Sequence, residues 1–227
     1  PNIDKNYTVS DSVKNAYERD IGTSFLTIRN FPDSNNFNKI IRPNIDSKGD
    51  IYLGYVGVLN KGRGLEQAIR ILQKFENRVK LILIGGGDLE KELKSLVDKL
   101  NLKSRVEFSG WVQPKQIPDI LSKVHIGLNL LDGESENYKY SLANKVFDYL
   151  HMGIPCLTMN FLEYKKINDE YECFILTDNL DTDVNYHLLN ELINDTEKYE
   201  ELSNNSFLAA REFDWNIEKE KLLKIFK

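Results

Sequence analysis

The sequence predicts an α/β protein built on a doubly wound, mostly parallel sheet. Short apolar runs alternate along the chain with segments whose apolar residues repeat at helical spacing, and the runs are continuously apolar. Such runs are typical of parallel strands that are covered by helices on both faces. Glycine-rich turns follow several runs, at the sheet edge where α/β proteins bind ligands. We therefore expect a Rossmann-like domain with its site at the carboxyl ends of the strands.

Composition narrows the possible functions. The chain has 227 residues, 41% of them hydrophobic, which is enough to bury a core. The net charge is −5 and no basic stripe alternates with aromatics, so nucleic acid is not an expected partner. We expect a soluble, cytoplasmic protein, because no signal peptide is present and no run approaches the roughly 18 apolar residues of a membrane span. The chain begins with Pro, which suggests a fragment.

Cysteine and histidine usage points to no cofactor chemistry. Cys156 and Cys173 lie in or beside apolar runs, so we expect buried thiols in a reducing compartment. His125, His151 and His187 are isolated and lack metal-ligand spacing. The sequence therefore predicts no metal site and no cofactor.

The first 50 residues differ from the rest. Tyr7–Val9 and Phe25–Ile28 are β-prone, and between them Ser10 or Asp11 caps a predicted helix that ends near Gly22. Residues 30–49 are polar and irregular, with Pro32, Pro43 and several Asn and Asp residues, which indicates a linker or a long loop. We interpret this part as a βαβ-like piece joined to a separate domain.

From Ile51 onward the alternation is regular. Helices are predicted where apolar residues recur every three or four positions, and strands where short apolar runs precede turns. The predicted strands are Ile51–Gly57, Val79–Ile84, Val106–Ser109, Val124–Leu131, Cys156–Met159 and Glu172–Leu176. The predicted helices are Leu65–Phe75, Leu89–Leu100, Pro114–Ser122, a segment from Tyr140 to Gly153, Val184–Leu192, Thr196–Glu212 and Ile217–Phe226. Pro155 follows the fourth helix, as expected beyond a helix end.

Four constellations fall on the ligand edge of this sheet, and each has a structural alternative. Gly57 to Gly64 brings Lys61 and Arg63 to a helix start, where a guanidinium binds diphosphate oxygens well, although it fits no dinucleotide or P-loop motif. The alternative is a glycine turn with solvated cations. Gly85-Gly86-Gly87 allows close approach of a ligand, or forms a strand-to-helix turn in which Asp88 caps the helix.

The third constellation is Gly110-Trp111-Val112, which either offers backbone groups and a flat surface to a base or only packs. The fourth is the helix predicted from Tyr140. Its amides near Ala143–Lys145 would face a phosphate that Lys145 could neutralise, and Asp148, one turn in, could accept hydrogen bonds from ribose. The alternative is an ordinary amphipathic helix with a solvated Asp148. The residues alone indicate binding of a nucleotide or a similar diphosphate.

The order of these motifs resembles the family-4 glycosyltransferases of GT-B fold, over nearly the whole chain. The resemblance is carried by Gly57 to Glu66, Leu83 to Gly87, Val106 to Val112, Asn144 to Pro155, Phe213-Asp214-Trp215 and the segment Tyr7 to Asn30. It implies two Rossmann-like domains facing a cleft, with the acceptor bound by the first and the nucleotide-sugar donor by the second. By this resemblance, residues 1–49 are a remnant of the acceptor domain plus a linker. Residues 50–212 are the donor domain and residues 213–227 a C-terminal helix.

The resemblance also implies roles for single residues. Arg63, with Lys61 as neighbour, matches a basic position on the donor diphosphate. Val112 matches a backbone contact to the base, and Asp148 matches the second acid of the family's Glu-x7-Glu pattern, on the ribose. This chain departs from the family in two places: Tyr140 stands where the first acid would touch the sugar, and Val58 stands where many members have an arginine. Glu134 or Glu136 could substitute for that acid.

The expected function is donor binding in a retaining, metal-independent glycosyltransferase that uses a UDP- or GDP-sugar. The acceptor would be a glycan or a lipid-linked sugar bound through a missing domain, and the whole protein could associate peripherally with the inner face of a membrane. Charge on the leaving diphosphate would be stabilised by fixed cations and helix dipoles. The catalytic residues are unknown, and the expected nucleotide-sugar site comprises Gly57, Lys61, Arg63, Gly86, Val112, Tyr140, Ala143, Asn144, Lys145 and Asp148. The alternatives are a nucleotide-sugar epimerase of the same fold and a non-catalytic nucleotide-binding module.

Overall fold

The computed structural model describes all residues except 1–4, 38–43, 46–48, 135, 141 and 226–227. Its main body is a six-stranded sheet in the order β5-β4-β3-β6-β7-β8, with every neighbouring pair parallel. The predicted doubly wound parallel sheet is therefore confirmed. The strands are β3 (Ile51–Val56), β4 (Val79–Ile84), β5 (Val106–Gly110), β6 (Ile126–Asn129), β7 (Cys156–Met159) and β8 (Phe174–Thr177).

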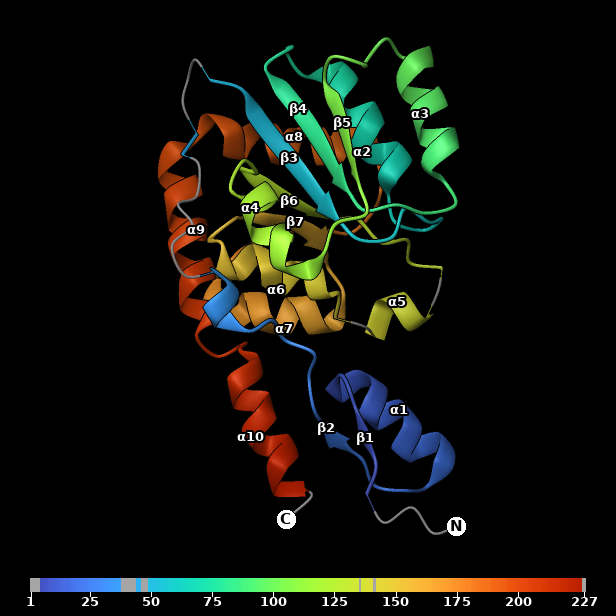
Figure 1. Ribbon diagram of the computed structural model, residues 1–227, viewed down its shortest axis with the longest axis vertical. Coiled ribbons are helices and arrows are strands. Elements are labelled where there is room, and N and C mark those ends of the chain that lie inside the picture. Colours follow the sequence, from blue (N-terminus) through green and yellow to red (C-terminus); the bar gives the residue numbers. More distant parts are fainter. Residues whose placement is uncertain (1–4, 38–43, 46–48, 135, 141, 226–227) are drawn as a thin grey trace.

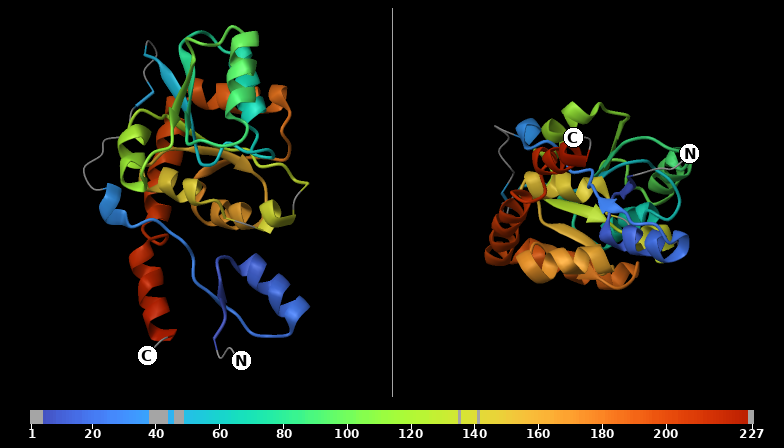
Figure 2. Two further views of the ribbon diagram at one scale, coloured as in Figure 1. Left: turned by 45° about the vertical axis from the view of Figure 1, so that its right-hand side comes forward. Right: turned by 90° about the horizontal axis from the view of Figure 1, so that it is seen from below.

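Helices cover both faces of this sheet (Figures 1 and 2). One buried cluster unites one face of the strands with α2 (Leu65–Ile71), α3 (Glu90–Lys99) and α8 (Thr182–Asn194). The other cluster unites the opposite face with α4 (Ile117–Leu121), α6 (Asn144–His151) and α7 (Leu162–Tyr171). The helix α9 (Thr196–Ala210) contributes to both. Short 3-10 turns, η2 (Leu72–Lys74) and η3 (Pro114–Gln116), follow α2 and precede α4.

The N-terminal segment forms the expected βαβ piece below the main sheet (Figure 1). The strands β1 (Tyr7–Thr8) and β2 (Leu26–Thr27) pair in parallel around α1 (Asp11–Ile21). The hydroxyl of Ser10 accepts from the Val13 amide, and Gly22 ends the helix in the left-handed region with φ of 71°. The helix α10 (Trp215–Ile225) descends beside this piece.

The described part of the linker region contains a short 3-10 turn, η1 (Ser34–Phe37), within the irregular stretch predicted for residues 30–49. Residues 38–43 and 46–48 of that stretch lie outside the described part. Within the described ranges, no helix is long and apolar enough to cross a membrane.

One prediction about helices was wrong, and one helix was not predicted. The helix predicted from Tyr140 to Gly153 is two elements: Tyr140 ends α5 (Glu136–Tyr140), and α6 begins only at Asn144. The break arises because Ala143 is extended (φ −76°, ψ 126°) and its amide donates to the hydroxyl of Tyr164, 2.9 Å away. The helix α7 was not predicted at all, because its charged and polar residues outnumber the few that face the core.

The hydroxyl of Tyr149 separates β3 from β6 near the ligand edge. These strands pair only at Leu53–Ile126 and Gly54–Gly127. Beyond that point the Tyr149 hydroxyl accepts from the Val56 amide (3.2 Å) and donates to the Gly54 carbonyl (3.0 Å). The phenol therefore stands in for ladder hydrogen bonds that the diverging strands no longer make, and it is fully buried.

We expect Tyr149→Phe to lower the free energy of unfolding by about 1–3 kcal/mol, because it leaves a buried amide and a buried carbonyl without that partner. Urea denaturation measures this loss. Tyr17→Phe is the matched control, because Tyr17 is 45% exposed on α1. If the two variants were equally stable, Tyr149 would not hold the strands in this way.

Candidate functional site

The strand order reverses direction between β3 and β6. From β3 the chain proceeds through β4 to β5 on one side, and from β6 through β7 to β8 on the other. Ligands of open α/β sheets bind at such a switch point, outside the carboxyl ends of the strands. The segments that meet there are the loop after β3, the loop after β4, the loop after β6, and the first turn of α6.

The loops after β3 and β4 are joined by backbone hydrogen bonds. The Gly57 amide donates to the Ile84 carbonyl (2.9 Å), and the Leu59 amide donates to the Gly86 carbonyl (3.0 Å). Gly85 has φ of 131°, and a Cβ added there would lie 2.0 Å from the Gly57 carbonyl oxygen. This close approach of two backbones explains the need for glycine at position 85.

The other end of this glycine loop lies under an exposed indole. A Cβ on Gly86 would lie 2.4 Å from Nε1 of Trp111, which itself is 72% exposed. Trp111 therefore does not pack into the core. This disagrees with the alternative interpretation of the sequence, in which Trp111 only packs. Val112 is partly buried against the second core cluster, so only its backbone is a candidate for contacting a base.

The loop after β6 contacts the loop after β3, as the sequence predicted for loops on one edge. The Asp132 amide donates to the Gly62 carbonyl (2.9 Å), and the Tyr138 hydroxyl donates to the Lys61 carbonyl (3.4 Å). The guanidinium of Arg63 lies 5.3 Å from the centre of the Tyr138 ring. Arg63 is thereby placed between the two loops, whereas the Lys61 side chain is exposed.

Arg63 and Lys145 bring two positive side chains to the switch point. The Nε atom of Arg63 is buried and has no hydrogen-bond partner among the described residues. Lys145 is 5% exposed; its Nζ lies 4.4 Å from the centre of the Tyr55 ring and 3.3 Å from Oδ1 of Asn129. Burial, reinforced by the charge of Arg63, lowers the pKa of Lys145 to about 7.

Asn129 and Tyr55 contact the side chain of Lys145. Asn129 is fully buried at the end of β6, and its amide nitrogen donates to the hydroxyl of Thr158 (2.9 Å). This leaves the Asn129 oxygen to accept from Lys145. The Tyr55 hydroxyl donates to the Val58 carbonyl (2.9 Å), and burial raises the pKa of Tyr55 to about 12.

Asp148 lies on the same helix as Lys145, three residues farther along. Its side chain is half-buried, and burial raises the pKa of Asp148 to about 7, an effect that the Lys145 charge partly offsets. Asn144, one turn earlier, is exposed at the start of α6. The structure therefore brings Gly57, Arg63, Lys145 and the first turn of α6 together, with Asp148 one turn farther along the helix.

Other predicted positions lie at the margin of this cluster. Tyr140 is 36% exposed, and its carbonyl accepts from the Ser10 hydroxyl of the N-terminal piece (2.9 Å). Glu134 and Glu136 are exposed in and beside α5. Sequence reasoning missed Tyr55, Asn129, Tyr138 and Tyr164. Of these, only Asn129 carried a signal, as a polar residue inside an apolar strand.

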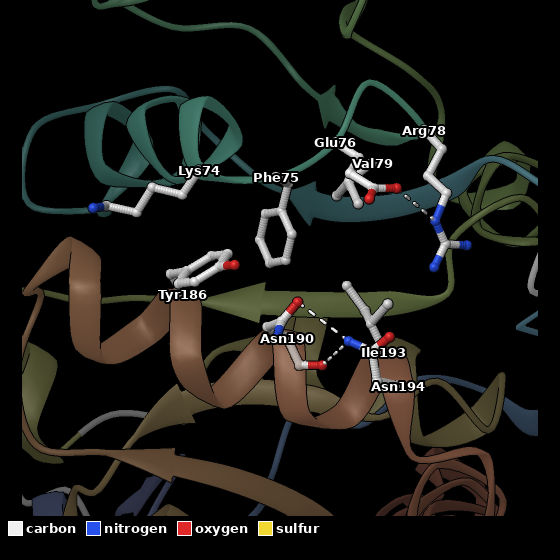
Figure 3. Close-up of a pocket in the computed structure, with 9 residues that line it drawn as sticks. All are labelled: Lys74, Phe75, Glu76, Arg78, Val79, Tyr186, Asn190, Ile193 and Asn194. Carbon is white, nitrogen blue, oxygen red and sulfur yellow. Dashed lines mark hydrogen bonds and ion pairs between the residues drawn. The ribbon is translucent and has the colours of Figure 1, made fainter.

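A different cavity lies at the opposite end of the sheet (Figure 3). It measures about 240 Å³ and is formed by the segment between η2 and the start of β4, together with α8. Its charged side chains are already paired, Lys74 with Asp183 and Arg78 with Glu76. This cavity is at the amino end of β4, away from the ligand edge. Among the described residues, no group of three or more His, Cys, Asp or Glu could hold a metal ion.

Solved structures of known proteins share the fold of this chain. HepE of Anabaena, solved in complex with UDP and glucose, superposes with a TM-score of 0.79 at 17% identity, covering 97% of this chain and 62% of HepE. Sucrose-phosphate synthase of Thermosynechococcus elongatus superposes with a TM-score of 0.81 at 16% identity, covering 99% of this chain and 58% of the enzyme. The chain thus spans about three fifths of the length of these proteins, whose fold it shares.

Sequence comparison gives the family. The chitobiosyldiphosphodolichol beta-mannosyltransferase of Yarrowia lipolytica is 30% identical over 83 residues, which are 37% of this chain and 17% of the yeast protein. The family model described as "Glycosyl transferases group 1" matches residues 36–208, most of the chain. The resemblance to a glycosyltransferase family is therefore confirmed, while the assignment to family 4 in particular stays a prediction. This chain belongs to the glycosyl transferases group 1 family.

Proposed function

We propose that this chain is the donor-binding part of a retaining glycosyltransferase that takes a UDP- or GDP-linked sugar. The acceptor is a glycan or lipid-linked sugar bound by a further domain, so that this part alone transfers nothing. The proposal rests on one observation: the buried Nε of Arg63, without a partner in the described chain, lies at the switch point with buried Lys145 and the start of α6.

This arrangement fits a diphosphate. Guanidinium N–H groups form strong, directional hydrogen bonds with phosphate oxygens, and a helix start adds amides and a positive dipole. Arg63 and Lys145 come from different elements, so the doubly charged group would bridge the β3 loop and α6. In the transfer step the same cations would stabilise charge as it develops on the departing diphosphate. No metal is required by this scheme, and metal independence stays a prediction.

The other proposed contacts are arranged in order along α6. Asn144 and Ala143 lie at the phosphate end, and Asp148, one turn farther, accepts hydrogen bonds from the ribose hydroxyls. The base reaches the backbone of Val112 beside Gly86. Tyr140 and Lys61 remain candidates for the sugar end and the diphosphate rim. HepE, which was solved with UDP and glucose, has the same fold and supports this general placement.

The buried ionisable groups are expected to make the empty site costly to fold. Asp148 has a pKa of about 7 in the folded chain, against about 4 for an unfolded aspartate. Between these values the folded carboxyl keeps a proton that the unfolded chain has lost, so the free energy of unfolding falls as pH rises from 4 to 7. The pKa of Lys145, lowered to about 7, has the opposite effect between pH 7 and 10.5. Their combined destabilisation is therefore greatest near pH 7.

One prediction of the proposed function concerns Arg63. We expect Arg63→Ala to weaken UDP or GDP binding at least tenfold, because a charge-assisted hydrogen bond is worth about 1.5–3 kcal/mol. Calorimetric titration with UDP, GDP and ADP measures this loss and also identifies the base. Arg70→Ala, which changes an exposed arginine on α2, the helix that follows Arg63, is the matched control and should bind like the original chain. Equal losses in both variants would point to long-range charge rather than a site.

Another prediction of the proposed function concerns Asp148. We expect Asp148→Asn to raise the free energy of unfolding by roughly 1–3 kcal/mol at pH 7.5 and by less at pH 5, because the amide removes the cost of the buried acid. Denaturation at the two pH values measures the difference. Asp169→Asn, an exposed residue paired with Lys165, serves as control. A gain that did not change with pH would contradict the raised pKa. The same variant should bind the nucleotide more weakly, through loss of a ribose contact.

Two other functions are separated from this proposal by direct assay. A nucleotide-sugar epimerase would release a changed UDP-sugar, which product analysis of the full-length protein with UDP-N-acetylglucosamine detects. A non-catalytic nucleotide-binding module would bind without transfer even in the full-length protein. Association with the inner face of a membrane stays a prediction for that longer protein.

A further inference from the structure

A cavity of about 390 Å³ runs beside α6, between that helix, the start of α4 and the linker. Asn144 and Asp148 both line it, because residues four apart share one face of a helix. Pro114 lines its far side, two residues after Val112. The cavity therefore extends from the first turn of α6 toward the loop after β5.

The linker forms a fixed wall of this cavity. Phe31 is only 6% exposed, and its ring lies 4.6 Å from that of Phe147 on α6. The carbonyl of Pro32 accepts from the Trp215 amide (2.9 Å), and the ring of Phe37 stacks on His151 at 5.1 Å. Contacts at both ends thus hold the segment from Phe31 to Phe37 against the helix.

The lining has the character of a nucleoside pocket rather than a phosphate pocket. Its floor is apolar, with Phe31, Ile117 and Pro118, and among the described residues that line it none is a lysine or an arginine. Ligand pockets typically combine an apolar lining with a few convergent polar groups. Here those groups are the carboxyl of Asp148 and three amide side chains, Asn144 from α6 and Asn30 and Asn36 from the linker, all lining the cavity.

We propose that Asn30 and Asn36 complete the nucleoside subsite, so that the linker determines which nucleoside the donor domain accepts. This inference rests on the proposed function. An asparagine side chain both donates and accepts, and so can bind ribose hydroxyls or a base edge. Asp148 contributes acceptors from the opposite wall. The phosphate end, at Arg63 and Lys145, does not involve the linker.

The test separates the two ends of the site with two probes. UDP or GDP, whichever binds, reports on the whole site, and inorganic pyrophosphate reports on the phosphate end alone. We expect Asn36→Ala and Asn30→Ala each to weaken nucleotide binding about three- to tenfold, the range of one to two lost hydrogen bonds, and to leave pyrophosphate binding unchanged. The preference for the ribonucleotide over its 2′-deoxy analogue should shrink in at least one variant.

Asn35→Ala is the matched control. Asn35 neighbours Asn36 in η1 and is exposed, as Asn36 is, but it does not line the cavity and donates instead to Asp33 (2.8 Å). It should bind both probes like the original chain. Thermal melting of all three variants guards against a merely structural effect, because none of them should shift.

The outcomes distinguish this inference from the proposed function. If both linker variants bind the nucleotide like the original chain while Arg63→Ala does not, the linker subsite is overturned and donor binding stands. Equal weakening of nucleotide and pyrophosphate would also overturn the subsite, because the effect would then not be confined to the nucleoside. If the original chain binds neither UDP nor GDP, the proposed function itself fails.

Discussion

The arrangement of the candidate site depends on the hydroxyl of Tyr149 between β3 and β6. At a switch point the crevice lies outside the carboxyl ends of the strands, where the strand order reverses. Here pairing stops at Gly54–Gly127, and one phenol satisfies the amide and the carbonyl that the divergence exposes. A Cβ on Gly127 would meet the Tyr149 ring at 2.4 Å, so glycine at 127 is what admits the ring. The helix that supplies Lys145 to the crevice thus also supplies the hydroxyl that bonds to β3 where it diverges from β6.

Burying cations at that crevice has an electrostatic consequence. Lys145 is attracted by the Tyr55 ring and by Asn129, but no carboxylate among the described residues forms a hydrogen bond with its Nζ. A single neutral oxygen and a ring face compensate poorly for lost hydration, which is why the pKa falls. A diphosphate would supply the missing opposite charge for Lys145 and the missing acceptor for Arg63 together. The reduced stability of the empty site and its affinity for an anion therefore both follow from the burial of these cations.

The sequence was sufficient for the strands and for the edge of the sheet on which the glycine turns lie, because both follow from local apolar pattern and from glycine turns, while the assignment of the site to that edge stays a prediction. The sequence did not predict backbone conformation that depends on a side chain far along the chain. The start of α6 depends on the hydroxyl of Tyr164, which lies 21 residues beyond Ala143, and α7, which carries this tyrosine, has too narrow an apolar face to be predicted. Arg63 could be singled out from its position in a glycine turn. The aromatic and amide residues around it could not, since Tyr55 and Tyr149 look like ordinary core residues in the sequence.

The linker shows why residues with no motif can still shape a site. Its sequence is polar and irregular, which predicts a linker or a long loop. Two aromatic residues fix this segment to the core: Phe31 enters the second core cluster, in contact with Phe147 and Phe213, and Phe37 stacks on His151. The chain end is fixed to the same segment, since the Trp215 amide binds Pro32 and the buried Glu218 accepts from the Arg29 amide. The connection between the N-terminal piece and the sheet is therefore held along α6, beside Asp148, and its position cannot change without changing the wall of the cavity that Asp148 lines.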